Sequence, residues 1–313
     1  MTDPQWERDL IASLATAALK EQWRARRWGI FFKLLTFTYI ALILAMFVDW
    51  EGRAEVAGGG KHTAMVEVSG IIAPGSNASA EKVTAALQAA FRDKNTQGVV
   101  VRINSPGGSP VQAQTIYDEM RRLRKKYPDS PLYAVVEDIS ASGGYFVAAG
   151  ADRIYVGRAS IVGSIGVLMN GFGFTGLMDK LGIERRLITA GENKGMLDPF
   201  SPMQESDVKH IEEMMGDIHQ QFIAAVREGR GERLKETPEI FSGSIWTGEK
   251  SVALGLADGF GSLESVAREV IKAETIVDYT RRESLLERAA KGLGAGAASA
   301  LAGLTLRGSP AFR

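Results

Sequence analysis

The chain has 313 residues, of which 37 are Lys or Arg and 37 are Asp or Glu, so its formal net charge is zero and gives no strong field to attract nucleic acid. It contains no cysteine, which excludes a thiol nucleophile, a disulfide framework and a cysteine-ligated metal. Its three histidines, His62, His210 and His219, show no H-x-x-x-H spacing or His/Asp cluster typical of a metal site. We therefore expect no metal and no cofactor.

The first fifty residues predict a membrane anchor. Residues 1–27 resemble a short amphipathic helix, and an apolar run follows from Trp28 to Val48 with Lys33 as its one charge. A helix of that length spans about 30 Å, the thickness of a bilayer core. A cleaved signal peptide and a buried core helix are the alternatives. The long polar lead and the uniform apolarity favour an uncleaved transmembrane helix at residues 28–50.

The charges around this apolar run predict its orientation. Arginines precede it and acidic residues follow it, which is the positive-inside pattern. We therefore expect a single-pass protein of the inner (cytoplasmic) membrane, with its N-terminus in the cytoplasm. Everything after residue 50 would then lie on the periplasmic or extracytoplasmic side.

The rest of the chain divides by composition into a Gly-rich linker at 51–62, a domain at 63–275 and a Gly/Ala-rich C-terminal tail at 276–313. Within the domain strands alternate with helices, which predicts an α/β fold with a mostly parallel sheet and helical crossovers. Strands are expected at 65–72, 98–103, 132–137, 153–156, 166–169 and 185–191. Helices are expected at 79–93 with Ser79 as N-cap, 111–127, 142–150 and 206–230.

One serine lies where a ligand site would form in such a sheet. Ser142 stands between a buried strand and a helix of small residues, and Gly143 and Gly144 follow it. The carboxyl end of a strand is where α/β sheets place ligands, and the start of a helix offers free N–H groups for an oxyanion. Ser142 could equally be only a helix N-cap. The local sequence leaves both interpretations open.

A second glycine-rich turn follows the preceding strand. It reads Asn104-Ser105-Pro106-Gly107-Gly108. Backbone amides of such a turn can form one wall of an oxyanion hole, with the Gly143 N–H as a further donor. A plain turn explains the segment by itself, but two such turns at adjacent strand ends favour a site.

Four motifs in order, INSPGGS, SASGGY, ASIVGSIGV and TAGENKGMLDPF, resemble the signal peptide peptidase A family of Ser-Lys proteases over residues 63–275. The resemblance implies a Clp protease/crotonase-like fold. It also implies Ser142 as nucleophile, Lys194 as general base, Ser164 as the residue that hydrogen-bonds the lysine amine, and Gly107 and Gly108 as the oxyanion-side turn. Where the family often has Tyr before the lysine, this chain has Asn193.

Lys194 can act as a base only when its amine is neutral, which requires a pKa far below the usual value of about 10.4. Desolvation in an apolar pocket would lower that pKa. Glu192 and Asp198 are close in sequence, and an ion pair with either would raise it, so both must point elsewhere. The alternative interpretation is a surface lysine beside acidic residues.

The resulting hypothesis is a membrane-anchored serine endopeptidase that degrades remnant signal peptides or other membrane-derived peptides, with no nucleic-acid partner. The resemblance further implies a homo-oligomer with sites where protomers meet. Ser142 and Lys194 of one chain could then lie too far apart to touch. A crotonase-like acyl-CoA enzyme and a non-catalytic membrane scaffold are the alternatives.

Overall fold

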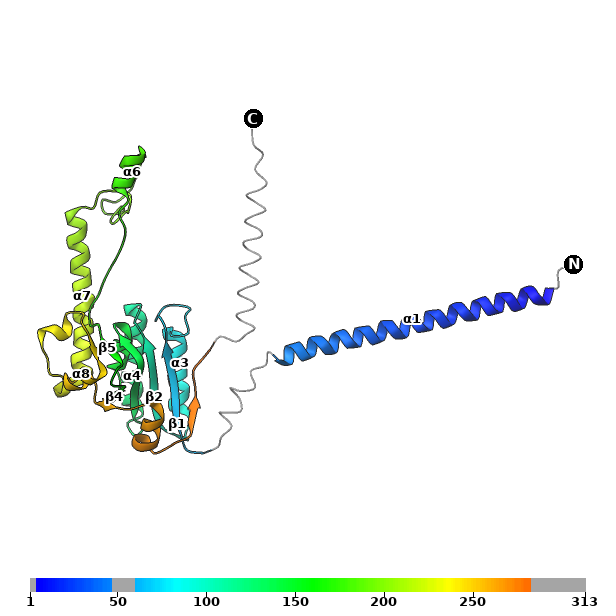
Figure 1. The fold of residues 1–313 in the computed structure, drawn as a ribbon, viewed down its shortest axis with the longest axis horizontal. Coiled ribbons are helices and arrows are strands. Elements are labelled where there is room, and N and C mark those ends of the chain that lie inside the picture. Colours follow the sequence, from blue (N-terminus) through cyan, green and yellow to red (C-terminus); the bar gives the residue numbers. More distant parts are fainter. Residues whose placement is uncertain (1–3, 47–59, 283–313) are drawn as a thin grey trace. The chain divides into compact units, whose positions relative to one another are not determined.

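The computed structural model describes residues 4–46 and 60–282 (Figure 1). These residues fall into two units. The first holds helix α1, Pro4–Met46. The second holds residues 60–282 and contains all of the described strands.

Helix α1 runs without a break through both predicted N-terminal segments, the amphipathic one and the apolar one. Apolar side chains of its second half are exposed, among them Trp28, Phe31 and Phe37. Among the described residues, no helix is both long enough and apolar enough to cross a bilayer. The predicted span at 28–50 extends beyond residue 42, the last residue of α1 whose side chain is described. The described part of this segment does not support a transmembrane helix.

The second unit is built on a mostly parallel sheet, as predicted. Its order is β6-β5-β3-β2-β1-β8, with β4 beside β3 and β7 beside β4. Among the described strands only β5 and β6 pair antiparallel. The strands are β1 His62–Ser69, β2 Thr96–Ser105, β3 Leu132–Ala141, β4 Arg153–Val156, β5 Ile161–Gly163, β6 Ile245–Thr247, β7 Gly259–Phe260 and β8 Ile276–Asp278.

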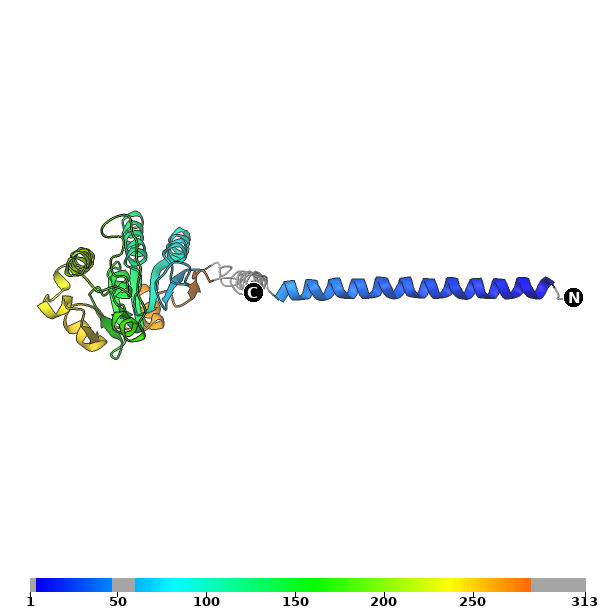
Figure 2. The same cartoon turned by 90° about the horizontal axis from the view of Figure 1, so that it is seen from above.

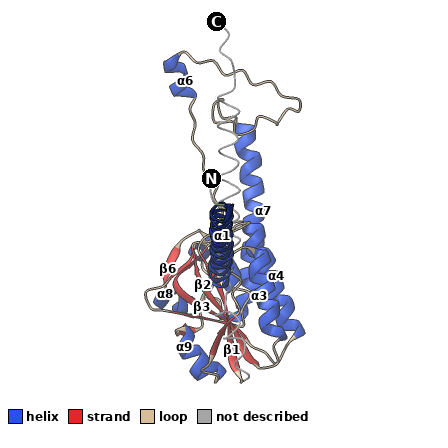
Figure 3. Ribbon diagram, turned by 90° about the vertical axis from the view of Figure 1, so that its right-hand side faces the viewer, coloured by secondary structure: helices blue, strands red, loops and turns tan. Residues whose placement is uncertain are grey.

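Helices cover both faces of the sheet, which is why its central strands are continuous apolar runs. Val99 and Val101 of β2 face the main core under α3 (Ala80–Arg92), α4 (Pro110–Lys126) and α5 (Gly143–Ala148). Val100 faces a smaller cluster under α9 (Leu263–Ser265) and the π-helix η3 (Val266–Ile271). Figures 2 and 3 show these layers, and in Figure 3 α3 and α4 lie on one side of the strands and α9 on the other.

The predicted strands at 65–72, 98–103, 132–137 and 153–156 correspond to β1 to β4, and the four predicted helices correspond to α3, α4, α5 and α7 (Glu205–Arg230). Ser79 occupies the N-cap position of α3, although its side chain makes no capping hydrogen bond. The predicted elements do not include α6 (Thr175–Leu181), α8 (Gly248–Ala253), α9, β5 to β8, the 3-10 helices η1 (Gly231–Arg233) and η2 (Pro238–Phe241), or the π-helix η3. Strand β8 begins at residue 276, just after the predicted end of the domain at residue 275.

Two predicted strands, at 166–169 and 185–191, are wrong, because neither segment has a neighbouring strand to pair with. Both belong to an extension, here called the arm, that comprises residues 166–215 and includes α6 and the first part of α7. Figures 1 and 3 show α6 beyond the end of α7 that is remote from the sheet. The apolar side chains of the arm face solvent, with Leu168 80%, Phe172 83% and Ile188 95% exposed.

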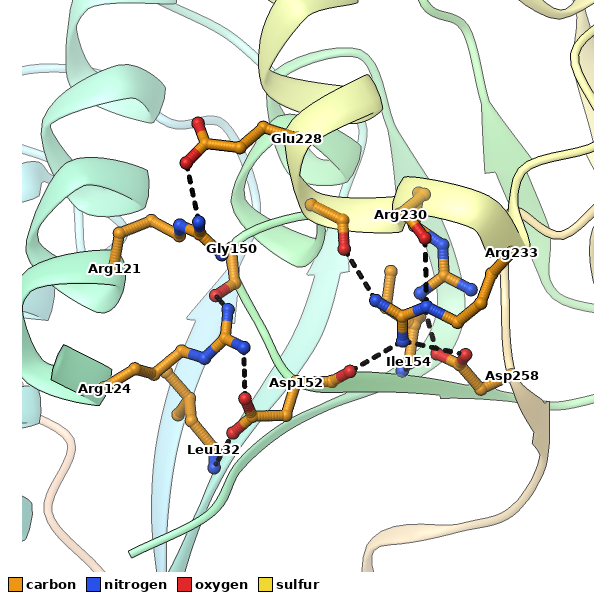
Figure 4. A network of polar contacts seen from close by, with 11 residues as sticks. Arg121, Arg124, Leu132, Gly150, Asp152, Ile154, Glu228, Arg230, Arg233 and Asp258 are labelled. Atoms are coloured by element: carbon orange, nitrogen blue, oxygen red, sulfur yellow. Dashed lines mark hydrogen bonds and ion pairs between the residues drawn. The ribbon is translucent and has the colours of Figure 1, made fainter. Parts of the chain in front are cut away.

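The opposite end of α7 is fixed to the sheet by a buried ionic network (Figure 4). Arg230, 1% exposed, donates to Asp258 Oδ2 over 2.7 Å and to Gly255 O over 2.8 Å. Asp258 also accepts from the Ile154 N–H at the start of β4, over 2.7 Å. Burial opposes ionisation of Asp258, but the hydrogen bond and charge of Arg230 outweigh it and hold the pKa of that carboxyl below its usual value. The arm therefore extends from a firmly anchored helix.

Candidate active site

Three of the predicted motifs meet at one edge of the sheet. β2 ends at Ser105, β3 at Ala141 and β5 at Gly163, and these strands pair in parallel. Parallel strands bring their carboxyl ends to the same edge, so the turns that follow them are neighbours. Ser142, Ser164 and the Gly107–Gly108 turn therefore lie together.

Ser142 is held in a conformation that is unusual for a residue with a side chain, with φ 51° and ψ −125°. The Ser142 N–H donates to Gly163 O over 2.8 Å, and its carbonyl accepts from the Phe146 N–H over 3.0 Å. Ser142 occupies the N-cap position of α5, but its side chain makes no capping hydrogen bond, so the helix does not engage its hydroxyl. Strain of this kind costs on the order of 1–3 kcal/mol and clusters at functional sites.

Two backbone N–H groups face the region beside Ser142. Gly143 is the first residue of α5, so its N–H has no acceptor inside the helix. Ile72 bridges Gly108 in parallel, with its N–H donating to Gly107 O and its carbonyl accepting from the Ser109 N–H. In such a bridge the Gly108 N–H faces away from Ile72. A Cβ built on Gly143 would lie 3.3 Å from Gly108 N, so these two donors are adjacent.

Gly107 has a different role in this turn. Its N–H donates to Ser105 Oγ over 3.1 Å, and Ser105 Oγ in turn donates to Gly70 O over 2.7 Å. A Cβ at Gly107, whose φ is 106°, would lie 2.8 Å from both Gly143 N and Ser142 Cβ. Gly107 thus keeps space for the site, and Gly108 carries the donor that the turn leaves available. Ser105 was not among the predicted site residues, because its only signal in the sequence is a serine between a buried strand and a Pro-Gly-Gly turn.

A cavity of about 500 Å³ adjoins these groups. Ser142, Ser164, Gly108 and Gly143 line it. Its other walls are mostly apolar and include Val167, Leu168, Phe146, Ile218 and Phe222, the rings of Phe146 and Phe222 stacking at 4.8 Å.

None of the chain's three histidines lines this cavity. His62, assigned to the linker by the sequence analysis, is instead the buried first residue of β1, where its ring approaches Tyr279 Oη at 3.1 Å. His219 Nε2 lies 3.1 Å from Ile165 O, and His210 is exposed on α7. A Ser-His pair at Ser142 therefore has no geometric basis within the chain.

Ser164 shares the cavity with Ser142 and is also strained, with φ 52°. Its N–H donates to Ser244 O over 2.7 Å, and its carbonyl accepts from the Gly166 N–H over 2.9 Å. These bonds fix the backbone of the residue from which the arm begins.

Lys194 is not at this site. It lies on the arm, where it is exposed, in a loop that lines a second cavity of about 720 Å³ together with part of α7. The cavities at Ser142 and in the arm share no lining residue. The chain thus brings together Ser142, Ser164 and the three glycines predicted for the site, and it places Lys194 elsewhere, without the apolar pocket that its proposed role requires.

One of the two acidic neighbours of Lys194 has its own partners. Asp198 Oδ2 accepts from Ser201 Oγ over 2.7 Å and from Arg185 Nε over 3.2 Å. These two hydrogen bonds lower the pKa of the Asp198 carboxyl below its usual value. Glu192 lines the arm cavity and makes no ion pair with a described residue. Asp198 therefore pairs with Arg185 and Ser201, and it makes no ion pair with Lys194.

The chain is similar to known proteases over the same region. The sequence profile of Peptidase family S49 matches residues 124–277, and that of Clp protease matches residues 65–165. The chain is 31% identical over 204 residues to the putative protease slr0021 of Synechocystis, covering 65% of this chain and 71% of that protein.

Two further relatives are longer than the region they share with this chain. A putative signal peptide peptidase SppA of Enterococcus faecium is 32% identical over 188 residues, which are 60% of this chain and 54% of that protein. A protein of Brucella abortus named Na(+)/H(+) antiporter NhaA is 44% identical over 183 residues, 58% of this chain but 25% of that protein. This chain thus spans a quarter to about half of these two relatives. With two family profiles, the Synechocystis protease and the α/β sheet in agreement, the chain belongs to peptidase family S49.

Proposed function

We propose that this chain is a serine endopeptidase that uses Ser142 as nucleophile and Lys194 as general base. The observation that carries the proposal is the strained Ser142 beside two adjacent backbone donors, in a cavity that no histidine lines. A serine nucleophile needs a neighbouring base, and the family to which the chain belongs supplies a lysine in that role.

The proposed reaction proceeds through an acyl-enzyme. Neutral Lys194 accepts the Ser142 hydroxyl proton as Oγ attacks the peptide carbonyl carbon. The Gly108 and Gly143 N–H groups donate to the resulting oxyanion, and one such donor is typically worth about 3 kcal/mol. Protonated Lys194 then protonates the amine as the C–N bond breaks. Water, deprotonated by the same lysine, hydrolyses the ester.

In this proposal the base reaches Ser142 from another copy of the chain. Ser142 lines one cavity and Lys194 lies in the loop that lines the other, so a single chain does not assemble the pair. The arm that carries Lys194 exposes many large apolar side chains, and contiguous exposed apolar surface marks interaction sites. A homo-oligomer in which the arm of one protomer covers the cavity of its neighbour would bury this surface and desolvate Lys194. Ser164 would then accept or donate a hydrogen bond to orient the amine.

For the substrate we propose extended peptides with apolar side chains, such as remnant signal peptides and other membrane-derived peptides. The apolar walls of the cavity at Ser142 would receive such a side chain. Gly108 forms an isolated parallel bridge with Ile72. A substrate peptide could pair with the Gly107–Gly108 segment as a further strand. The name of the Enterococcus relative, signal peptide peptidase, agrees with this class.

Reaction of the purified full chain with a fluorophosphonate probe, followed by peptide mapping, tests this proposal. The probe phosphonylates activated serines, so the adduct is expected on Ser142. An adduct on another serine, or none while the protein is folded and assembled, would overturn the assignment of the nucleophile.

We also propose that residues 28–50 anchor the catalytic domain in the inner membrane, with the domain on the extracytoplasmic side. The proposal rests on the sequence of the apolar run, its single charge at Lys33 and the arginines before it. In membranes from cells that express the full chain, the protein is expected to stay in the pellet after carbonate extraction. Release of the intact full chain into the supernatant would contradict the anchor.

A further inference from the structure

The loop that carries Lys194 is a run of tight turns. The Lys194 N–H donates to Gly191 O over 3.1 Å, Met196 N–H to Asn193 O over 3.2 Å and Asp198 N–H to Gly195 O over 3.2 Å. Asp198 follows Lys194 by four residues along this run. Asp198 is thus one of two acidic residues close to Lys194 along the chain, the other being Glu192.

Asp198 is instead held by Arg185 and Ser201. Arg185 Nε lies 3.2 Å and Ser201 Oγ 2.7 Å from the same oxygen, Asp198 Oδ2, and the Asp198 side chain is 12% exposed. The Lys194 amine makes no hydrogen bond or ion pair with any residue that the structure describes. Of the two acidic residues next to Lys194 along the chain, Asp198 is therefore engaged by an arginine.

The arginine is itself fixed in place. Its guanidinium lies 5.9 Å from the centre of the Phe200 ring, and Phe200 stacks on Phe174 at 5.5 Å. The Phe174 N–H donates to Pro199 O over 2.7 Å, which ties the two ends of the arm loop together. Arg185, whose side chain is 41% exposed, thus contacts both the Asp198 carboxylate and the Phe200 ring.

We propose that Arg185 is a positioning residue: it holds the Asp198 carboxylate away from Lys194 and so keeps the lysine available as a neutral base. This inference rests on the proposed role of Lys194. Without the arginine, Asp198 would be free to pair with the protonated amine. An opposite charge within about 4–6 Å favours the charged form of a lysine and raises its pKa, commonly by about 1–3 units.

Other charged groups surround the same loop. Arg186 pairs with Glu184 over 2.9 Å on the exposed side. Three further carboxylates line the arm cavity and have no ion pair with a described residue, Glu192, Asp207 and Glu212. These groups stay unchanged in the variants below, so they contribute a constant background. Arg186 also offers a matched control, since its removal deletes one positive charge next to Arg185 without releasing Asp198.

The experiment measures the rate of fluorophosphonate labelling at Ser142 against pH for the full-length protein and for R185M, D198N, R185M/D198N and R186M. In R185M the midpoint of the rising limb is expected to move up by about one pH unit, so the rate at lower pH falls about tenfold. The double variant R185M/D198N is expected to regain the original midpoint, since the released carboxylate is gone. R186M is expected to keep it.

Three results would overturn the inference. The first is an unchanged midpoint in R185M. The second is a loss in R185M that is equal at every pH and is not restored by D198N, which would mean that Arg185 only maintains the fold of the arm. The third is an equal shift in R186M, which would mean that any nearby charge suffices. Lys194→Ala separates the two levels: undiminished labelling in that variant refutes the dyad itself, whereas its loss with an unchanged R185M refutes only the role of Arg185.

Discussion

Ser142→Ala is expected to lower kcat/KM for peptide hydrolysis by at least about 10⁴-fold, because it removes the atom that forms the acyl-enzyme. Lys194→Ala is expected to cost about 10²–10⁴-fold, the usual contribution of a general base. Hydrolysis of an apolar reporter peptide by the assembled, purified variants measures both effects. Undiminished hydrolysis by either variant would refute the role of that residue.

Both substitutions should leave the fold intact. The Ser142 side chain caps nothing on α5, and alanine adopts its backbone conformation at a similar cost, so the melting temperature should stay close to that of the wild type. Lys194 is exposed. Lys180 on α6 is a second exposed lysine of the arm, and Lys180→Ala should retain hydrolysis. A matching loss in the Lys180 variant would point to the charge of the arm and away from Lys194 as a base.

The central strands and their helices could be predicted because each has a recognisable pattern in its own local sequence. Strands β1 to β4 are short apolar runs between turns, and α7 shows a helical apolar stripe over its whole length. Short strands such as β6 and β7 are three and two residues long, too short to show any periodicity. They exist only because a neighbouring strand is present, which a local pattern does not reveal.

The arm shows where the pattern misleads. Residues 166–169 are as apolar as a core strand and residues 185–191 contain the apolar pair Leu187 and Ile188, yet neither segment pairs with a described strand, and Leu168 and Ile188 are exposed. Apolarity indicates that a segment is to be buried, but it does not say by what. Among the described residues no strand lies beside these two segments, so the strand prediction failed.

The candidate site likewise has a part that local sequence predicts and a part that it does not. Ser142, Gly143, Gly108 and Ser164 follow the ends of adjacent parallel strands, so sequence and elementary sheet geometry suffice to bring them together. The finer assignment of Gly107 as spacer and Gly108 as donor needed the Ser105 hydrogen bond, which no pattern contains. The remoteness of Lys194 was anticipated only through the family resemblance, since a sequence separation of 52 positions from Ser142 carries no distance information.

A mixture of the two inactive variants is expected to recover activity if the pair is formed between protomers. In a site shared by neighbours, a Lys194→Ala protomer supplies an intact Ser142 and a Ser142→Ala neighbour supplies an intact Lys194. Random co-assembly of equal amounts places both in about one quarter of the sites, so about one quarter of the wild-type rate should return. Differently tagged variants, co-expressed and purified through both tags, provide the mixed assemblies for this measurement.

The control is co-expression of Ser142→Ala with the Ser142→Ala/Lys194→Ala double variant, which offers no intact serine and should stay inactive. An inactive mixture of the two single variants, in assemblies that carry both tags, would require each chain to complete its own site. The arm would then have to fold back until Lys194 enters the cavity at Ser142. Such a movement would have to begin near Ser164 and Gly166, yet the bonds from Ser164 to Ser244 and from His219 to Ile165 brace that point. Recovery of activity on mixing is therefore the outcome that leaves the observed backbone in place.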